Sequence, residues 1–431
     1  MTVPRVFKIG VLVFRAVVCF ALLYVLGNIS LHINSSFLRP ASGSRIPADI
    51  LQEYNYIKGV IDSPDAVPQM EKQGSTIFMT QEFAIMIPSL AAFGMRNLAI
   101  KDPSLRVEAA SYIAKAIEQL KDPACYRFVA RQFGDPFKDG NIRDNAFYLG
   151  HLTLALAYYR EVSGDSRYDE LFHRFAKAFY RNYKNSPTLC LNSYTDYAWT
   201  SEQAVPLAAL KIHDDIFGTN YKEAIYAWEK KMRAAFIDKE SGLLVKEVDA
   251  KTGFHDNEVC MIPNAWTILF LHDVLPEFTR KLYANTRREL LIKRLGFPLF
   301  KEFLRGRQRV TCDTGPIVWG ISPSGTVFGM GCAAIMNDGA VYQPIRYLSN
   351  LVGLSVSWGS RRKYLSGGRM GTAALFWVKT ESLFTEVNNY PLPIKNILMI
   401  DLALFLLFLW VFWMLKIVRR DWREFFFKTL S

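Results

Sequence analysis

The chain has 431 residues, of which 50% are hydrophobic and 14% aromatic, and its formal net charge is +12 at pH 7. A chain of this length and composition is enough for one large domain or two medium ones with a sizeable buried core. Its excess basic residues gather at the two ends of the chain, beside apolar segments, and no nucleic-acid-binding motif is present. This pattern indicates a membrane protein rather than a nucleic-acid-binding one.

The first predicted element is a transmembrane helix over residues 16–33. The segment contains no charged residue and is about long enough to cross a bilayer. A cleaved signal peptide is the alternative, because basic residues precede the segment, but no small-x-small cleavage site follows it. The sequence therefore favours an uncleaved anchor, with a cytoplasmic N-terminus, over residues 1–35.

The middle of the chain, 36–394, is predicted to consist of helical hairpins. Short connections with helix-starting residues recur about every 60 residues, which is typical of an architectural repeat with one hairpin per unit. Each connection follows a long apolar segment and precedes a more charged one. The connections are marked by Asp102, Asp165, Thr219, Pro276 and Asp338.

The two helices of each hairpin differ in character. The leading helix is apolar nearly all round, as in TVFGMGCAAIM at 326–336, whereas the trailing helix is amphipathic, as in YKEAIYAWEKKMRAAF at 221–236. A helix that is apolar all round must be buried on every side, and an amphipathic helix covers it from outside. With a last helix at 369–385, about six hairpins fit an all-α fold, an (α/α)6 barrel with almost no sheet. An open superhelical solenoid is the alternative.

Four long connections precede the predicted inner helices, at 121–143, 185–199, 237–258 and 304–322. In a closed ring of hairpins these connections and the starts of the inner helices meet at the same end. Loops on a rigid scaffold commonly carry binding and catalytic residues. We therefore expect a pocket on the axis at this end.

The last predicted element is a second transmembrane helix over 396–418. It is long, ends in an aromatic belt and is followed by basic residues. Both termini should therefore be cytoplasmic, with residues 395–431 forming this helix and a basic tail. The barrel then lies on the other side of the membrane, in the periplasm or an extracytoplasmic lumen. Cys19 falls in the first span, and the other five cysteines leave room for one disulfide bridge and indicate no zinc site.

Proton-transfer candidates lie at the starts of two neighbouring inner helices. The helix that begins NAFYLGH carries Tyr148 and His151 three residues apart, which predicts that both point at the axis. The stretch before the next inner helix adds Asp196 and Glu202. Such groups can give a proton to one part of a substrate and take one from another, so these four are the predicted catalytic residues.

Aromatic and polar residues of the same long connections are candidates for substrate binding. Aromatic faces exclude water and orient a substrate. For any single residue a structural role remains the alternative: loop capping, aromatic packing or, for His151, a satisfied core histidine. The substrate-binding candidates are Tyr194, Tyr197, Trp199, Cys260, Trp266, Asp313 and Trp319.

Several of these stretches resemble the linalool dehydratase/isomerase family, best over 141–338. The resemblance rests on NAFYLGHLTLALAYYREVSGDSRYDELF, GTNYKEAIYAW, NAWTILFLHDVLPEF and DTGPIVWGISPSGTVFGMGCAAIMND. It implies an (α/α)6 barrel and the reversible, cofactor-free loss of water from a tertiary terpene alcohol, with allylic isomerisation. The tyrosine–x–glycine–histidine step of the family matches Tyr148, Gly150 and His151, and this implies a histidine in the substrate pocket.

The chain also departs from the family pattern. Ser193 and Glu202 stand where the family has two cysteines, although Asp196 matches the aspartate between them. The early catalytic aspartate of the family has no clear counterpart near 54–65. The cysteine-assisted mechanism of the family therefore does not transfer as a whole.

These observations predict a membrane-anchored, cofactor-independent lyase or isomerase that needs no metal. Its substrate would be a small hydrophobic alcohol or another amphipathic molecule, and its oligomeric state is left open. One alternative is a non-catalytic, ligand-binding barrel of an envelope assembly. Another is a glycan-active hydrolase or lyase, by analogy of fold alone.

Overall fold

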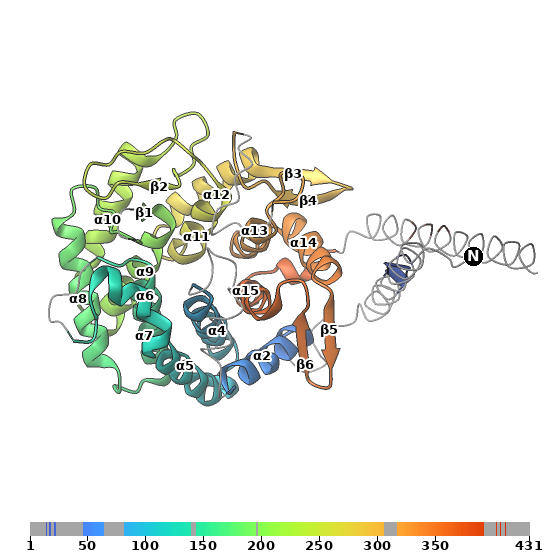
Figure 1. Ribbon diagram of the computed structural model, residues 1–431, viewed down its shortest axis with the longest axis horizontal. Helices are drawn as coiled ribbons and strands as arrows, with labels where there is room; N and C mark the ends of the chain where they lie inside the picture. Colours follow the sequence, from blue (N-terminus) through green and yellow to red (C-terminus); the bar gives the residue numbers. More distant parts are fainter. Residues whose placement is uncertain are drawn as a thin grey trace, which may run out of the picture.

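The computed structural model describes the barrel and only isolated positions of the terminal segments (Figure 1). Apart from those isolated positions, both predicted transmembrane segments, 16–33 and 396–418, lie outside the described residues. Within the described part of the chain, no helix combines the length and the apolar character needed to cross a membrane. The continuous stretches described are 46–63, 82–138, 144–194, 197–305 and 317–391.

Inner helices form a closed ring around a central axis (Figure 1). Each packs against the next along the chain, and the last packs against the first, which closes the ring and rules out the open solenoid. The predicted closed barrel is therefore confirmed. The inner helices are α4 (Glu82–Lys101), α7 (Tyr148–Ser163), α9 (Thr200–Phe217), α11 (Met261–Leu271), α13 (Pro323–Ile335) and α15 (Gly368–Thr380).

Outer helices cover this ring. The five predicted connections each join an inner helix to the outer helix that follows, so the hairpin repeat is confirmed; the first outer helix, α2, packs against α15. Short 3-10 helices, η2 (Pro103–Leu105), η4 (Glu381–Phe384) and η5 (Val387–Asn389), and the π-helical η3 (Met232–Phe236) extend helix ends. The outer helices are α2 (Ala48–Ile61), α5 (Arg106–Leu120), α8 (Asp169–Asn185), α10 (Lys222–Lys231), α12 (Pro276–Leu290) and α14 (Gly339–Val352).

Burial separates the two layers as the sequence pattern predicts. Every residue of α11, Met261–Leu271, is buried, because the helix has inner neighbours on both sides, α12 outside and the axis inside. The outer helix α8 buries a single stripe and exposes its charged face. That stripe consists of Phe172, Phe175, Ala176, Ala178, Phe179 and Tyr183.

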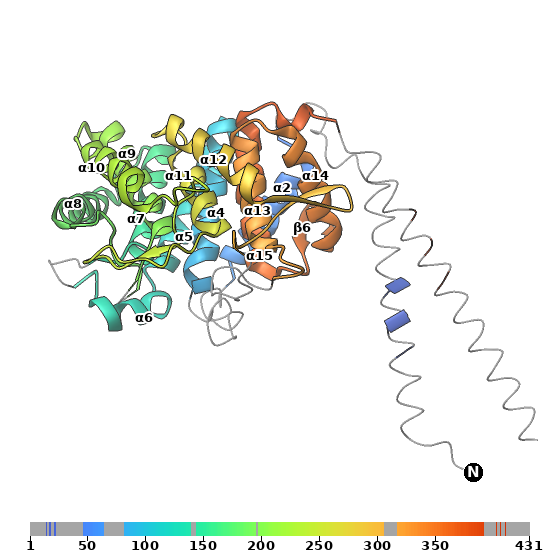
Figure 2. The ribbon, with the colours of Figure 1, turned by 90° about the horizontal axis from the view of Figure 1, so that it is seen from above.

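The inner helices all begin at one end of the ring, which we call the mouth, and end at the other, the rear. The mouth carries α6 (Pro123–Phe133), seen at the lower end of the ring in Figure 2, and short antiparallel hairpins in place of the plain loops that were expected. The described strands pair as β1 (Ala198–Trp199) with β2 (Glu247–Val248), β3 (Leu291–Arg294) with β4 (Phe297–Phe300), and β5 (Ser355–Trp358) with β6 (Arg361–Tyr364).

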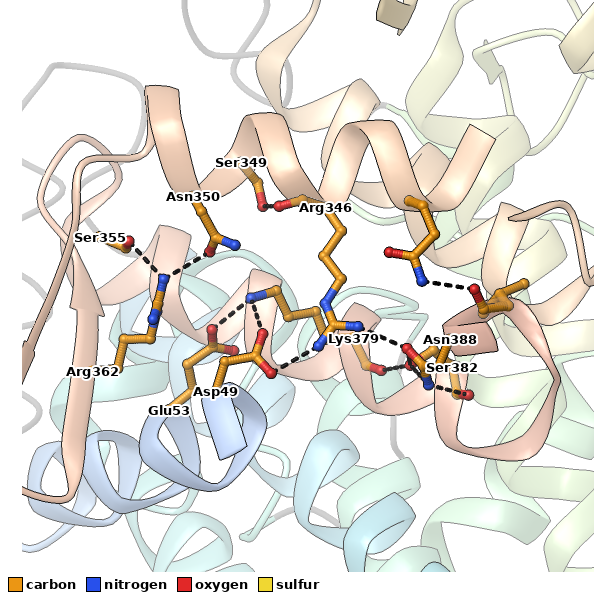
Figure 3. A network of polar contacts seen from close by, with 12 residues as sticks. Asp49, Glu53, Arg346, Ser349, Asn350, Ser355, Arg362, Lys379, Ser382 and Asn388 are labelled. Atoms are coloured by element: carbon orange, nitrogen blue, oxygen red, sulfur yellow. Dashed lines mark hydrogen bonds and ion pairs between the residues drawn. The ribbon is translucent and has the colours of Figure 1, made fainter. Parts of the chain in front are cut away.

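A buried ionic cluster joins the first outer helix to the last hairpin (Figure 3). Arg346 of α14 lies 2.7 Å from Asp49 of α2, and Lys379 of α15 lies 2.7 Å from Glu53 and 3.1 Å from Asp49. All four side chains are fully buried. Burial would raise the pKa of Asp49, but the charges of Arg346 and Lys379 outweigh it and hold that pKa well below its usual value. The cluster fastens the two ends of the ring to each other.

The cysteines of the described chain are not paired with one another. Cys125, Cys190, Cys260 and Cys332 are buried and free of disulfides. The other two, Cys19 and Cys312, lie outside the described residues. The single disulfide that the sequence left open is thus not formed among the cysteines that the structure describes.

Candidate active site

Aromatic side chains from the inner helices fill the axis of the ring. Phe93 of α4, Phe270 and Trp266 of α11, Phe328 of α13 and Trp377 of α15 contact one another, with ring centroids 5.1–6.4 Å apart. We call these five residues the axial aromatic cluster. It gives the site an apolar floor that excludes water and strengthens electrostatic interactions above it.

His151 lies against the mouth side of this cluster, in the first turn of α7. Its ring stacks on Phe93 at 5.8 Å and lies 5.5 Å from Trp266. The side chain is fully buried, yet neither ring nitrogen has a hydrogen-bond partner among the described residues. A satisfied core histidine would have such a partner. Burial lowers the pKa of His151 to about 3, so the imidazole is neutral at physiological pH.

Glu202 faces His151 from the first turn of α9. Its Oε2 atom is 3.8 Å from His151 Nε2 and has no hydrogen-bond partner in the described chain. Burial, and then the nearby charge of Glu82, raise the pKa of Glu202 to about 8. At neutral pH a protonated carboxyl group therefore lies beside an unprotonated imidazole. A substrate oxygen placed beside both atoms can contact each, although they are too far apart to bond directly.

Glu82 supplies a second carboxyl group that was not predicted from the sequence. It lies in the first turn of α4 and accepts a hydrogen bond from the Tyr194 hydroxyl. Burial raises the pKa of Glu82 to about 7, although the Tyr194 bond acts in the opposite direction. An acid at the start of a helix is also common for reasons of helix stability, so the sequence alone gave no reason to select it.

Two amide side chains hold the mouth connections against the inner helices. Gln203 of α9 accepts a hydrogen bond from the Leu191 N–H at 2.8 Å and donates one to the Leu191 carbonyl oxygen at 2.9 Å. Asn264 of α11 makes the same pair of bonds with Leu244, at 2.9 and 3.3 Å. Because Gln203 directly follows Glu202, its bonds fix the turn from which Glu202 extends.

A glycine allows α7 and α9 to approach each other next to the site. A Cβ atom on Gly150 would lie only 2.9 Å from Pro206 Cδ of α9. The start of α7 is capped by Asn145, whose side-chain oxygen accepts a 2.7 Å hydrogen bond from the Tyr148 N–H. Gly150 and the Asn145 cap together set the position of His151 relative to Glu202.

The structure corrects the predicted orientation of Tyr148. Its hydroxyl donates a 2.8 Å hydrogen bond to the Leu120 carbonyl oxygen, and its ring stacks on Tyr126 at 5.5 Å. The side chain therefore faces α5 and α6 rather than the axis. Residues three apart on a helix differ in direction by about 60°, and a long tyrosine side chain turns that angle into a different set of neighbours.

The remaining candidates divide between the mouth and the surface. Trp199 is buried, donates a 3.1 Å hydrogen bond to Glu247, and packs edge-on against Tyr194 at 5.3 Å. Tyr197 and Trp319 are 54% and 87% exposed, so the structure does not place them in the site. The catalytic candidate Asp196 and the binding candidate Asp313 lie outside the described residues.

Cys260 lies at the mouth end of α11, directly before its first residue, and is buried. The carboxyl group of Glu302, which the sequence analysis did not select, lies beside it, and burial raises the pKa of Glu302 to about 7. No group of three or more His, Cys, Asp or Glu side chains in the described stretches is arranged to hold a metal ion. The described residues of the site place acid–base groups on an aromatic floor.

The linalool dehydratase/isomerase family model matches residues 196–298. The resemblance found in the sequence is confirmed over this segment. The matched residues run from the connection before α9 through α11 to the β3–β4 hairpin. The segment includes Glu202, Cys260 and Trp266, whereas His151 precedes it.

Several solved structures are similar in overall arrangement. A family 105 glycoside hydrolase from C. acetobutylicum is 12% identical, covering 75% of this chain and 98% of its own, with a TM-score of 0.44. A family 76 glycoside hydrolase from a bovine Bacteroides thetaiotaomicron strain is 10% identical, covering 78% of each chain, with a TM-score of 0.49. A cellobiose 2-epimerase from Bacillus thermoamylovorans is 11% identical, covering 61% of this chain and 81% of its own, with a TM-score of 0.38. Similarity at this level says nothing about substrate.

Proposed function

We propose that the chain is a cofactor-independent lyase or isomerase that removes water from an uncharged hydrophobic alcohol. The observation that carries this proposal is the pair formed by Glu202 and His151, whose pKa values of about 8 and about 3 reverse the usual order of the two groups. Two titratable groups whose environments separate their pKa values are typical of an acid and a base in one site. The family match over 196–298 supports the same reaction class.

In the proposed reaction Glu202 acts as the acid and His151 as the base. The Glu202 carboxyl group gives its proton to the substrate hydroxyl while the C–O bond breaks, and water leaves. His151 takes a proton from the neighbouring carbon, so that a double bond forms. Positive charge that develops on the substrate is stabilised by the faces of Phe93 and Trp266. Transfer of the proton from His151 back to Glu202, 3.8 Å away, restores the starting state.

The mouth favours a substrate without negative charge. Carboxyl groups of the buried Glu202 and Glu302 and of the partly buried Glu82 lie there, with pKa values of about 8, 7 and 7, and Lys246 is already paired with Glu247 and Glu258. A phosphate or carboxylate on the substrate would meet these acidic groups, and the nearby cation that the described residues supply, Lys246, is already paired. We therefore propose a neutral alcohol.

A glycan-active enzyme is the alternative that one observation favours. Glu82 and Glu202 are close enough for the charge of Glu82 to raise the pKa of Glu202, and paired carboxyl groups serve glycoside hydrolysis. Such a mechanism needs one carboxylate ionised and room for a sugar ring. The raised pKa of both groups and the aromatic packing on the axis support dehydration instead.

The experiment is an assay of the purified full chain with linalool and related tertiary allylic alcohols, following the dehydrated and isomerised products. We expect Glu202→Gln to lower the rate by about two to four decades and His151→Ala to abolish turnover without unfolding the barrel. Glu381→Gln is the matched control, because Glu381 is also buried with a raised pKa but lies at the rear. Full activity in folded Glu202→Gln would reject the proposed acid. A sharply lower melting temperature of His151→Ala, with activity in its folded fraction, would show that His151 is a structural core residue and not the base.

Membrane attachment is also a proposal. Arg346 binds Asp49 and, at 2.7 Å, Asn388, so the described barrel begins and ends at neighbouring positions. Two apolar segments that leave from one region of the barrel can enter the same membrane side by side. We propose that the barrel is held on the extracytoplasmic side by both segments.

A further inference from the structure

Glu302 lies at the mouth between the starts of α11 and α13. Its backbone carbonyl accepts a 2.8 Å hydrogen bond from the Met261 N–H, which fixes this residue beside the first turn of α11. Burial raises its pKa, and the nearby Ser322 hydroxyl, Ile262 N–H and Cys260 thiol lower it to a smaller extent. The carboxyl group thus lies among polar groups of two neighbouring inner helices.

The carboxyl group of Glu302 lacks the partners that a buried acid normally has. The side chain is fully buried, and neither oxygen makes a hydrogen bond of normal geometry within the described chain. Nearby Lys246 is 3.6 Å from Glu258 Oε2, while Glu258 Oε1 is also buried and unpartnered. The Ile262 N–H of α11 acts on this carboxyl group but lowers its pKa less than burial raises it, so Glu302 differs from an ionised helix cap with a lowered pKa. Unpaired buried acceptors are costly, and a ligand that donates hydrogen bonds to them would offset that cost.

Glu302 and the proposed reaction centre lie beside successive turns at the mouth end of α11. Glu302 lies beside Ile262, and Trp266, which contacts His151, follows one turn later in α11. Cys260 and Trp266 are separated by about 9 Å along the helix axis, at about 1.5 Å per residue. A ten-carbon chain is longer than this rise, so its length allows a substrate with one hydroxyl between Glu202 and His151 to place its other end near Glu302.

We propose that Glu302, with Ser322 and Cys260 around it, forms a second polar subsite that binds a second hydroxyl group of the substrate. The inference rests on the proposed function, in which the axis binds an alcohol. It narrows the substrate class from simple hydrophobic alcohols to amphipathic alcohols with a hydrogen-bond donor at each end. Carboxyl oxygens accept hydrogen bonds from hydroxyl groups, and they repel anionic groups.

Two probes with one carbon skeleton test this subsite: linalool, which has a single hydroxyl, and 8-hydroxylinalool, which has a second one at the far end. Dissociation constants are measured with the full chain in detergent micelles from tryptophan fluorescence. We expect the diol to bind the wild-type protein about tenfold more tightly, the size of one good hydrogen bond to a buried carboxyl group. Glu302→Met should remove this preference, and Glu302→Gln should reduce it at least about threefold, because an amide offers one acceptor instead of two. Glu381→Gln, the matched control at the rear, should keep it.

The inference is overturned if the wild-type protein binds both alcohols equally, binds neither, or keeps the preference in folded Glu302→Met. If Glu302→Met loses its helical circular dichroism, Glu302→Gln decides, and an unchanged preference in that variant contradicts the subsite. Turnover separates this result from the proposed function. A diol preference without turnover rejects the reaction and keeps the subsite, whereas turnover without a preference rejects the subsite alone.

Discussion

At the scale of single residues, the site depends on burial that changes which group holds the proton. Glu202 and His151 come from adjacent helices and lie above the axial aromatic cluster, so neither is solvated. Because burial disfavours the charged form of each group, the acid keeps its proton and the imidazole stays unprotonated. In water near neutral pH, an ordinary glutamate is instead ionised and an ordinary histidine is partly protonated.

This arrangement predicts that Glu202 lowers the stability of the folded chain at high pH although the proposed activity requires it. The carboxyl pKa is about 4.5 in the unfolded chain and about 8 in the folded one, so its contribution to stability is complete below pH 4.5 and is lost as the pH rises to 8. We expect Glu202→Gln to unfold at a higher temperature than wild type at pH 8, by an amount equivalent to a few kcal/mol, and to show no such gain at pH 4. Thermal unfolding at both pH values measures this. An equal difference at the two pH values would contradict the raised pKa.

The same pKa sets the pH dependence of the rate. If protonated Glu202 is the acid, the wild-type rate should be constant below pH 8 and fall about tenfold per pH unit above it. The pKa of His151 is about 3, so its protonation should not limit the rate above that value. Initial rates from pH 5 to 10 test this. A rate that instead rises through pH 8 would show that the ionised form of Glu202 is the active one.

At the scale of elements, the contact between α7 and α9 sets the geometry of the acid–base pair. Gly150→Ala would place a methyl group 2.9 Å from Pro206 Cδ and push the two helices apart. We expect at least a tenfold loss of activity and a stability cost of about 1–3 kcal/mol, the usual size for overpacking. Gly371→Ala in α15 is the control, because nothing lies within 4 Å of its added carbon. Equal behaviour of the two variants in activity and denaturant unfolding would argue against this contact as the positioning element.

At the scale of the whole molecule, the ionic cluster in Figure 3 holds the ring closed. Lys379→Met would leave Asp49 and Glu53 buried without their shared cation, and we expect a loss of about 3–5 kcal/mol in the free energy of unfolding. Lys211→Met, which removes an exposed partner of Asp215, should cost less than about 1 kcal/mol. Chemical denaturation of both variants measures the difference. Comparable small losses would mean that packing alone closes the ring.

The membrane topology is tested on the intact chain in cells. Basic residues flank both apolar segments on their outer sequence sides, so reporters fused to either terminus should report the cytoplasm. A reporter in the 237–258 connection should report the opposite compartment. A cytoplasmic signal from that connection would overturn the proposed localisation. It would also remove the oxidising compartment in which a disulfide bridge could form.

The sequence by itself determined the hairpin repeat, the two layers and the presence of His151 and Glu202 at the mouth. These features follow from local patterns: helix periodicity shows which faces are buried, and the connections mark where inner helices begin. Even the resemblance to the linalool dehydratase/isomerase family came from contiguous stretches.

Only the tertiary structure decided which side chains meet. Tyr148 donates a hydrogen bond to the Leu120 carbonyl oxygen instead of facing the axis. Glu82 accepts a hydrogen bond from Tyr194, 112 residues further along the chain, and Lys379 binds Asp49 across 330 residues. The reason is physical: side-chain partners and burial depend on through-space packing between distant segments, which no local pattern encodes. The reversed pKa values of Glu202 and His151, on which the proposed function rests, arise from that packing, and so they too belong to the fold rather than to the sequence pattern.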